Sequence, residues 1–200
     1  AASDVYKRQV VDIAITDHTV IKAADGYFYV YATESTRNVP IMKSKDLVEW
    51  TYCNTAFTNK TRPRFEPKAG IWAPDINYIN GKYVLYYAMS VWGGEQTCGI
   101  GVATANSPQG PFTDHGKMFR SNEIGVQNSI DPSLLQYEGR NYLVWGSFRG
   151  IYVIELTADG LSIMPGAKKK RIAGTAFEAV YIHKYGDYYY MFASIGSCCQ

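Results

Sequence analysis

Three carboxylic acids, Asp17, Asp131 and Glu178, each stand eight or nine residues ahead of a glycine that the sequence places in a tight turn. Hydrolysis of a glycosidic bond uses one ionised carboxylate to activate water and one protonated carboxyl group to donate to the leaving oxygen. A third acid close by holds the pKa of the donor up by like-charge repulsion. Three acids gathered at one pocket would therefore suit the hydrolysis of a sugar linkage.

The chain must bring these acids together from distant positions, and a repeat indicates how. Alignment on Gly26, Gly81, Gly139 and Gly186 shows the same unit four times: an apolar or β-branched run, a turn, and a Tyr-rich run. This pattern is typical of a β-hairpin. The glycines are 55, 58 and 47 residues apart. A period in this range, with several short strands in each copy, predicts a β-propeller.

One position of the repeat holds an acid in three copies out of four. The residue eight or nine positions before the turn glycine is Asp17, Ala73, Asp131 and Glu178 in successive copies. The first strand of each propeller blade lines the central axis, so equivalent positions on different blades converge at one end of that axis. The three carboxylates are therefore predicted to face one pocket. Asp75, two residues past the Ala73 position, is expected to hydrogen-bond the backbone near the axis instead.

Composition favours an all-β domain, because the 200 residues include 17 Tyr and 18 Gly and show few helical patterns. We expect residues 10–200 to form part of a propeller, about three and a half blades. An open ring would leave an unpaired strand edge, so the chain is expected to be the N-terminal part of a longer protein. Residues 1–9 fit no strand pattern and are expected to be a non-native or disordered leader.

Several classes of protein are disfavoured. The net charge of +2 gives no reason to expect a nucleic-acid partner, and no run of about 18 apolar residues suggests a membrane span. The cysteines, Cys53, Cys98, Cys198 and Cys199, do not have the spacing of metal ligands. The sequence contains no GxSxG, HExxH or paired CxxC motif, which argues against serine hydrolases, zinc proteases and structural zinc sites.

The matching units read TDHTVIKAADGYFYVYAT, WAPDINYINGKYVLYYAMS, SIDPSLLQYEGRNYLVWGS and EAVYIHKYGDYYYMFASIGSCC. Together they resemble glycoside hydrolase family 43, the five-bladed propeller enzymes that include arabinanases, α-L-arabinofuranosidases and β-xylosidases. The resemblance implies that Asp17 is the general base, Asp131 the acid that orients the donor and tunes its pKa, and Glu178 the general acid. It also implies inversion at the anomeric carbon, with the base and the acid about 6.5 to 9.5 Å apart.

The sequence departs from the family pattern beside two of the acids. His18 follows Asp17 where the family commonly has Pro, and Ala179 and Val180 follow Glu178 where Gly or Ala and then Pro are more usual. These departures bear on local backbone geometry more than on chemistry. The resemblance further implies no cofactor for the chemistry, a calcium ion on the propeller axis in many members, and an extracellular or periplasmic location. We expect a monomer with a carbohydrate partner.

Flat side chains suit sugar rings, whose C–H faces are apolar. The predicted substrate-binding residues are Trp72, Ser147, Phe148 and Arg149, with Trp92 and Trp145 as further candidate walls of the pocket. Trp72 directly precedes the Ala73 position, and the Ser147–Arg149 stretch is expected in a loop between strands at the rim.

The first-choice function is arabinan endo-1,5-α-L-arabinosidase or α-L-arabinofuranosidase activity, because the last of the four units is closer to arabinanase-like members. Activity as a β-xylosidase is an alternative, and endo and exo action both stay open. The rival from another class is a non-catalytic carbohydrate-binding propeller, in which the acids bind sugar hydroxyls. A retaining hydrolase is a third reading, and it would place the base and the acid about 5 to 5.5 Å apart.

Overall fold

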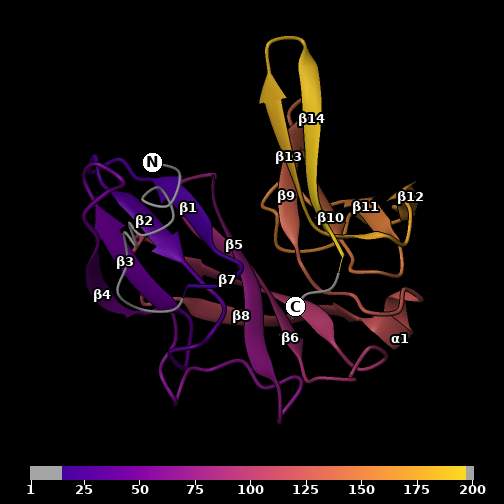
Figure 1. The fold of residues 1–200 in the computed structure, drawn as a ribbon, viewed down its shortest axis with the longest axis horizontal. Helices are drawn as coiled ribbons and strands as arrows, with labels where there is room; N and C mark the ends of the chain where they lie inside the picture. Colours follow the sequence, from indigo (N-terminus) through magenta and orange to yellow (C-terminus); the bar gives the residue numbers. More distant parts are fainter. Residues whose placement is uncertain (1–14, 197–200) are drawn as a thin grey trace, which may run out of the picture.

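The computed structural model describes residues 15–196 and has the predicted all-β fold (Figure 1). Its strands are β1 (Thr19–Lys22), β2 (Phe28–Tyr31), β3 (Pro40–Ser44), β4 (Thr51–Thr55), β5 (Gly70–Ile79), β6 (Lys82–Ser90), β7 (Gly99–Ala105), β8 (Thr113–Arg120), β9 (Ser133–Tyr137), β10 (Arg140–Trp145), β11 (Ile151–Glu155), β12 (Lys170–Ala173), β13 (Phe177–Tyr185) and β14 (Tyr188–Ile195). A short helix, α1 (Ser121–Ile124), follows β8. Within residues 15–196 no helix is long and apolar enough to cross a membrane. The predicted leader, residues 1–9, and Cys198 and Cys199 lie outside the described residues.

The strands form three antiparallel sheets of four strands and one hairpin, all in chain order. Sheet 1 contains β1 to β4, sheet 2 contains β5 to β8, and sheet 3 contains β9 to β12. The remaining pair, β13 and β14, forms the hairpin. Within each sheet, every strand pairs with its neighbours in sequence. The repeated hairpins predicted from the turn glycines are therefore confirmed.

The turns of these hairpins show which residues of the first strands occupy equivalent positions. Asn80–Gly81 has φ values of 48° and 81° and Glu138–Gly139 has 49° and 75°, as a type I′ turn requires. In Gly186–Asp187 the glycine comes first, with φ 59°, and it alone of the two has positive φ. Counting eight residues back from the second turn residue gives Ala179, not Glu178. The predicted equivalence of Glu178 with the other two acids is therefore wrong by one residue.

The sheets pack against one another in chain order around strongly apolar interfaces. Strand β6, in sheet 2, is buried on both faces, because successive side chains of a strand point in opposite directions. Leu85 faces sheet 1 and packs in a cluster with Tyr31, whereas Tyr86 faces sheet 3 and packs in a cluster with Leu143. This packing sets the first strands side by side, with β5 touching both β1 and β9, and β9 touching β13.

The hairpin of β13 and β14 packs on sheet 3 through part of its surface only. Val180 joins a cluster with Val144 of β10. The hairpin projects away from the three sheets (Figure 1). Large apolar side chains on it are exposed: Tyr188 is 70% exposed, Phe192 59% and Ile195 74%.

Candidate active site

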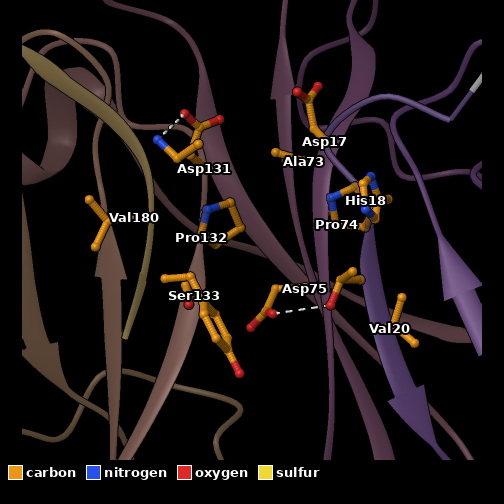
Figure 2. A pocket seen from close by; sticks show the side chains of 13 residues that line it. Asp17, His18, Val20, Ala73, Pro74, Asp75, Asp131, Pro132, Ser133 and Val180 are labelled. Atoms are coloured by element: carbon orange, nitrogen blue, oxygen red, sulfur yellow. Dashed lines mark hydrogen bonds between the residues drawn. The ribbon is translucent and has the colours of Figure 1, made fainter. Parts of the chain in front are cut away.

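Four non-glycine residues with left-handed backbone mark the place where the first strands converge. They are Asp17, Ala73, Asp131 and Ala179, with φ values of 47°, 41°, 56° and 50°. Such residues cost about 1–3 kcal/mol each and cluster at functional sites. All four line a cavity of about 360 Å³, and Asp17 and Asp131 lie at the same end of it, on opposite sides (Figure 2). The same local bend, within β5 and β13 and just before β1 and β9, thus directs side chains toward one region.

The residue before each bend lines a second, larger cavity of about 550 Å³. These residues are Thr16, Trp72, Ile130 and Glu178. Asp17 and Asp131 line this cavity as well as the smaller one. The three predicted acids therefore meet at the larger cavity, although Glu178 reaches it from the position that Trp72 occupies on β5.

Asp17 is exposed and is held by a hydroxyl group. Thr33 Oγ1 donates to Asp17 Oδ2 at 2.7 Å and accepts from the N–H of Ala73 at 2.8 Å. The next residue, Glu34, fixes this loop through an ion pair with Arg62, whose side chain is 7% exposed and that of Glu34 8%. Burial raises the pKa of Glu34, but hydrogen bonds from Arg62 and from backbone amides hold that pKa below its usual value. The buried pair thereby keeps Thr33 beside the acid.

Glu178 and Asp131 are half-buried, and each accepts a hydrogen bond from a neighbouring element. Ser147, just past β10, donates from Oγ to Glu178 Oε2 at 3.1 Å. The N–H of Ala179, in β13, donates to Asp131 Oδ2 at 3.1 Å. One bond runs from sheet 3 to the hairpin and the other runs back, so the two acids are oriented by the same junction.

The surroundings of Asp131 raise its pKa. Burial raises the pKa of Asp131, the N–H of Ala179 lowers it, and the negative charges of Glu178 and Asp17 raise it further, to about 7. Asp131 is therefore partly protonated near neutral pH. The role predicted for Asp131, tuning the proton affinity of the donor, stays a prediction.

Asp131→Asn should change how stability depends on pH. The folded pKa of about 7 lies above the usual value of 3.8, so between these values the folded protein holds a proton that the unfolded chain has lost. The free energy of unfolding of the wild type should therefore fall as pH rises through this window. Asn keeps an acceptor for Ala179 but carries no such proton, so its unfolding temperature should rise relative to the wild type from about pH 5 to about pH 8. Thermal unfolding across this range measures the difference, and a difference that does not change with pH would contradict the assignment.

Asp75 lies further along the smaller cavity, away from Asp17 and Asp131 (Figure 2). It is 9% exposed and accepts hydrogen bonds from Asn77 Nδ2 at 2.7 Å and from the N–H of Leu134 at 2.8 Å. Burial raises the pKa of Asp75 to about 6 despite these bonds. The bond from Leu134 confirms that Asp75 binds backbone near the axis, where it joins β5 to β9.

Aromatic side chains line one part of the larger cavity. Trp72 and Trp92 have ring centroids 5.5 Å apart at an interplanar angle of 52°, and Trp92 is 77% exposed. Phe148 also lines this cavity. Trp145 does not, because it is fully buried and donates from Nε1 to Ser129 Oγ at 3.1 Å. The prediction of Trp145 as a candidate wall is therefore wrong, and it belongs to the core.

The structure also separates the two polar rim residues. Ser147 lines the larger cavity, whereas Arg149 does not. Arg149 donates from Nη2 and Nε to the two carboxylate oxygens of Glu95, at 2.9 and 3.1 Å. Its donors are thus directed at another loop, and nothing in this arrangement places Arg149 on a substrate.

Comparison with known proteins gives a family for this arrangement. A model described as "Glycosyl hydrolases family 43" matches residues 6–200. The chain belongs to this family. The resemblance inferred from the four repeated units is therefore confirmed.

Family 43 relatives extend the match. The "Arabinan endo-1,5-alpha-L-arabinosidase A" of Aspergillus niger is 32% identical over 186 residues, which cover 89% of this chain and 57% of that protein. The "Extracellular endo-alpha-(1->5)-L-arabinanase 1" of Bacillus subtilis is 35% identical over 198 residues, 92% of this chain and 60% of that protein. The solved structure of a Cellvibrio cellulosa alpha-L-arabinanase complexed with arabinohexaose aligns with a TM-score of 0.83 at 28% identity, over 94% of this chain and 67% of that one. The chain thus spans less than two thirds of the length of these two curated relatives.

Sequence reasoning missed three polar residues of this family 43 site, Thr33, Glu95 and Asn128, which all line the larger cavity. Thr33 follows β2, and its N–H donates to Thr16 O just before Asp17, so the hairpin register would have revealed it. Glu95 and Asn128 lie in loops whose sequence carries no periodic pattern.

The described residues of this family 43 chain do not form a metal site. Within residues 15–196 no three or more His, Cys, Asp or Glu side chains are grouped so that they could hold an ion. His18 and Asp75 line the smaller cavity, but Asp75 is already bound by protein donors. Residues 15–196 therefore offer no ligand set that fits an axial calcium ion.

Proposed function

We propose that this protein is an inverting glycoside hydrolase that cleaves α-1,5-linked arabinan or arabino-oligosaccharides. The observation that carries the proposal is the meeting of Asp17, Asp131 and Glu178 at one cavity, each with a different hydrogen-bond donor. Family membership and the printed functions of the arabinanase relatives support this choice of reaction and sugar.

The three acids are given distinct roles. Glu178 donates a proton to the glycosidic oxygen as the bond to the anomeric carbon breaks. Asp17, exposed at the cavity, takes a proton from the water that attacks the opposite face of the sugar. Asp131 is assigned the third role predicted from the sequence, orienting the donor and tuning its proton affinity, and the repulsion between the two negative carboxylates supports the tuning.

We propose that the three sheets and the hairpin are blades of a five-bladed propeller whose other parts lie outside the 200 residues. The sequential packing of the sheets and the convergence of their first strands support a propeller. The exposed Phe192 and Ile195 of the hairpin would be covered by further strands.

Trp72→Ala in the full-length protein is expected to raise KM for arabino-oligosaccharides about 10-fold, because Trp72, beside Trp92, offers an apolar ring face to the sugar ring. The value of kcat should change little, since the indole takes no part in proton transfer. Steady-state kinetics measure both constants. Tyr52→Ala, which removes an exposed ring from β4 away from the cavity, is the matched control. An unchanged KM in Trp72→Ala would remove this wall from the substrate site.

The substrate is tested with the full-length protein on linear arabinan, an aryl α-L-arabinofuranoside and an aryl β-xyloside. Cleavage of arabinan supports the proposal, and cleavage of the aryl arabinofuranoside alone would indicate an α-L-arabinofuranosidase. Cleavage of the xyloside alone would indicate a β-xylosidase. Binding without any cleavage would favour a non-catalytic carbohydrate-binding propeller.

The place of action follows from the substrate. We propose an extracellular or periplasmic protein, because polymeric arabinan does not enter cells and because one relative is described as extracellular. We further propose a monomer that needs no cofactor for the chemistry. Fractionation of the producing cells tests the location, and light scattering of the purified protein tests the monomer.

A further inference from the structure

A short segment past β10 connects Glu178, the proposed general acid, to the loop between β6 and β7. The segment Ser147–Arg149 bends through Phe148, which has φ 50°. Ser147 donates to Glu178 Oε2, and the N–H of Phe148 donates to the carbonyl of Phe177 at 2.9 Å. The segment therefore touches both Glu178 and the residue before it, so its position decides how the carboxyl group of Glu178 is held.

The segment is held by a hydrogen bond from Asn128 and by the ion pair of its own Arg149 with Glu95. Asn128 Nδ2 donates to the carbonyl of Ser147 at 3.0 Å. Arg149 Nη1 donates to the carbonyl of Phe148 at 3.0 Å while its other nitrogens donate to Glu95. A paired ion contact of this kind restricts the guanidinium to one plane, because both N–H···O bonds must be satisfied together.

Glu95 is itself on a well-anchored loop between β6 and β7. Its carbonyl accepts from the N–H of Asn128 at 2.7 Å, and its carboxylate also accepts from Gln127 Nε2 at 2.5 Å. The N–H of Cys98 donates to the carbonyl of Gly94 at 2.9 Å, which closes a turn around Glu95. Glu95 thus lies in a loop of sheet 2, and Arg149, which it binds, lies in a loop of sheet 3.

We propose that Glu95 and Arg149 are positioning residues: their paired contact holds Ser147 against Glu178 and so orients the proton donor. The inference rests on the proposed function of Glu178. It assigns Arg149 a role through Ser147 and Glu178 in place of contact with the substrate. The side chains of Arg149 and Glu95 are 43% and 32% exposed, and exposed pairs contribute little to stability, so variants at these positions are expected to fold.

The test compares Arg149→Lys with wild type in the full-length protein on two substrates, linear arabinan and a dinitrophenyl arabinotrioside. Lys keeps the charge but cannot make the paired contact. We expect kcat on arabinan to fall about 10-fold, because small misplacement of a catalytic group is costly. The dinitrophenyl substrate should be cleaved at nearly the wild-type rate, since its leaving group needs no proton. Arg140→Lys is the matched control, because Arg140 pairs with Glu155 in sheet 3 at 3.6 Å and is 64% exposed.

A second variant separates a specific role from general damage. Glu95→Gln should give the same pattern, and the double variant should be little worse than either single one, because both changes break the same contact. Equal losses on both substrates would mean structural damage and would overturn the proposal. A higher KM with unchanged kcat would place Arg149 on the substrate and also overturn it, as would full activity on arabinan. If the wild type cleaves neither substrate, the proposed function fails before this question arises.

Discussion

Glu178→Gln is expected to lower kcat on linear arabinan by about 10²- to 10⁴-fold, the usual contribution of a general acid. Gln is close in size to Glu and still accepts the hydrogen bond from Ser147, so the fold and the cavity should persist. What is lost is the proton for the leaving oxygen. Initial rates with purified full-length wild type and variant measure the effect.

The identity of the leaving group shows whether the loss is that of a proton donor. A dinitrophenolate departs without protonation, so Glu178→Gln should cleave a dinitrophenyl arabinotrioside at close to the wild-type rate. Glu49→Gln, at an exposed position in the segment between β3 and β4, is the matched control and should keep full activity on both substrates. An equal loss on both substrates would show that Glu178 is not the general acid.

Asp17→Asn is expected to lower kcat on both substrates by about 10²- to 10⁴-fold, because the variant lacks the carboxylate that is proposed to activate water. Asn tolerates the left-handed backbone that this position requires, which Ala would not do as well. Its side-chain oxygen also keeps an acceptor for Thr33. The loss should therefore reflect the missing base and not a local rearrangement.

The two variants should differ in how their activity depends on the leaving group. The kcat of Asp17→Asn should stay low even with a good leaving group, whereas Glu178→Gln should be rescued by it. Asp187→Asn, in the exposed turn of the hairpin, serves as the control for an acid-to-amide change. Appreciable activity of Asp17→Asn on the dinitrophenyl substrate would exclude Asp17 as the general base.

The hairpins and the convergence of their first strands follow from local rules that a single sequence displays. Turn residues and alternating Tyr-rich runs predict each hairpin, and their repetition predicts which ends come together. The one-residue error at Glu178 has a local cause too. Glycine takes the first place in the Gly186–Asp187 turn but the second in Asn80–Gly81, so alignment on the glycine shifts the fourth copy.

Contacts between loops that are distant in the chain cannot be predicted from such local rules. Arg149 was expected to bind substrate, yet its partner Glu95 lies 54 residues earlier in a loop without a periodic pattern. Trp145 was a candidate wall, but its position in β10 directs it into the core between sheets 2 and 3, on the side opposite Val144. The raised pKa of Asp131 depends on its burial and on two charges from other strands. Each of these features arises only when the sheets have packed.

The central claim is that three converging acids hydrolyse an arabinan linkage by a single displacement. Proton NMR of linear arabinan during the first minutes of hydrolysis by the full-length protein tests this directly, because it detects both the cleavage and the configuration of the new reducing end. The account predicts that the β-anomer appears first from the α-linked substrate and then equilibrates with the α-anomer. First appearance of the α-anomer, or no cleavage at all, would contradict it.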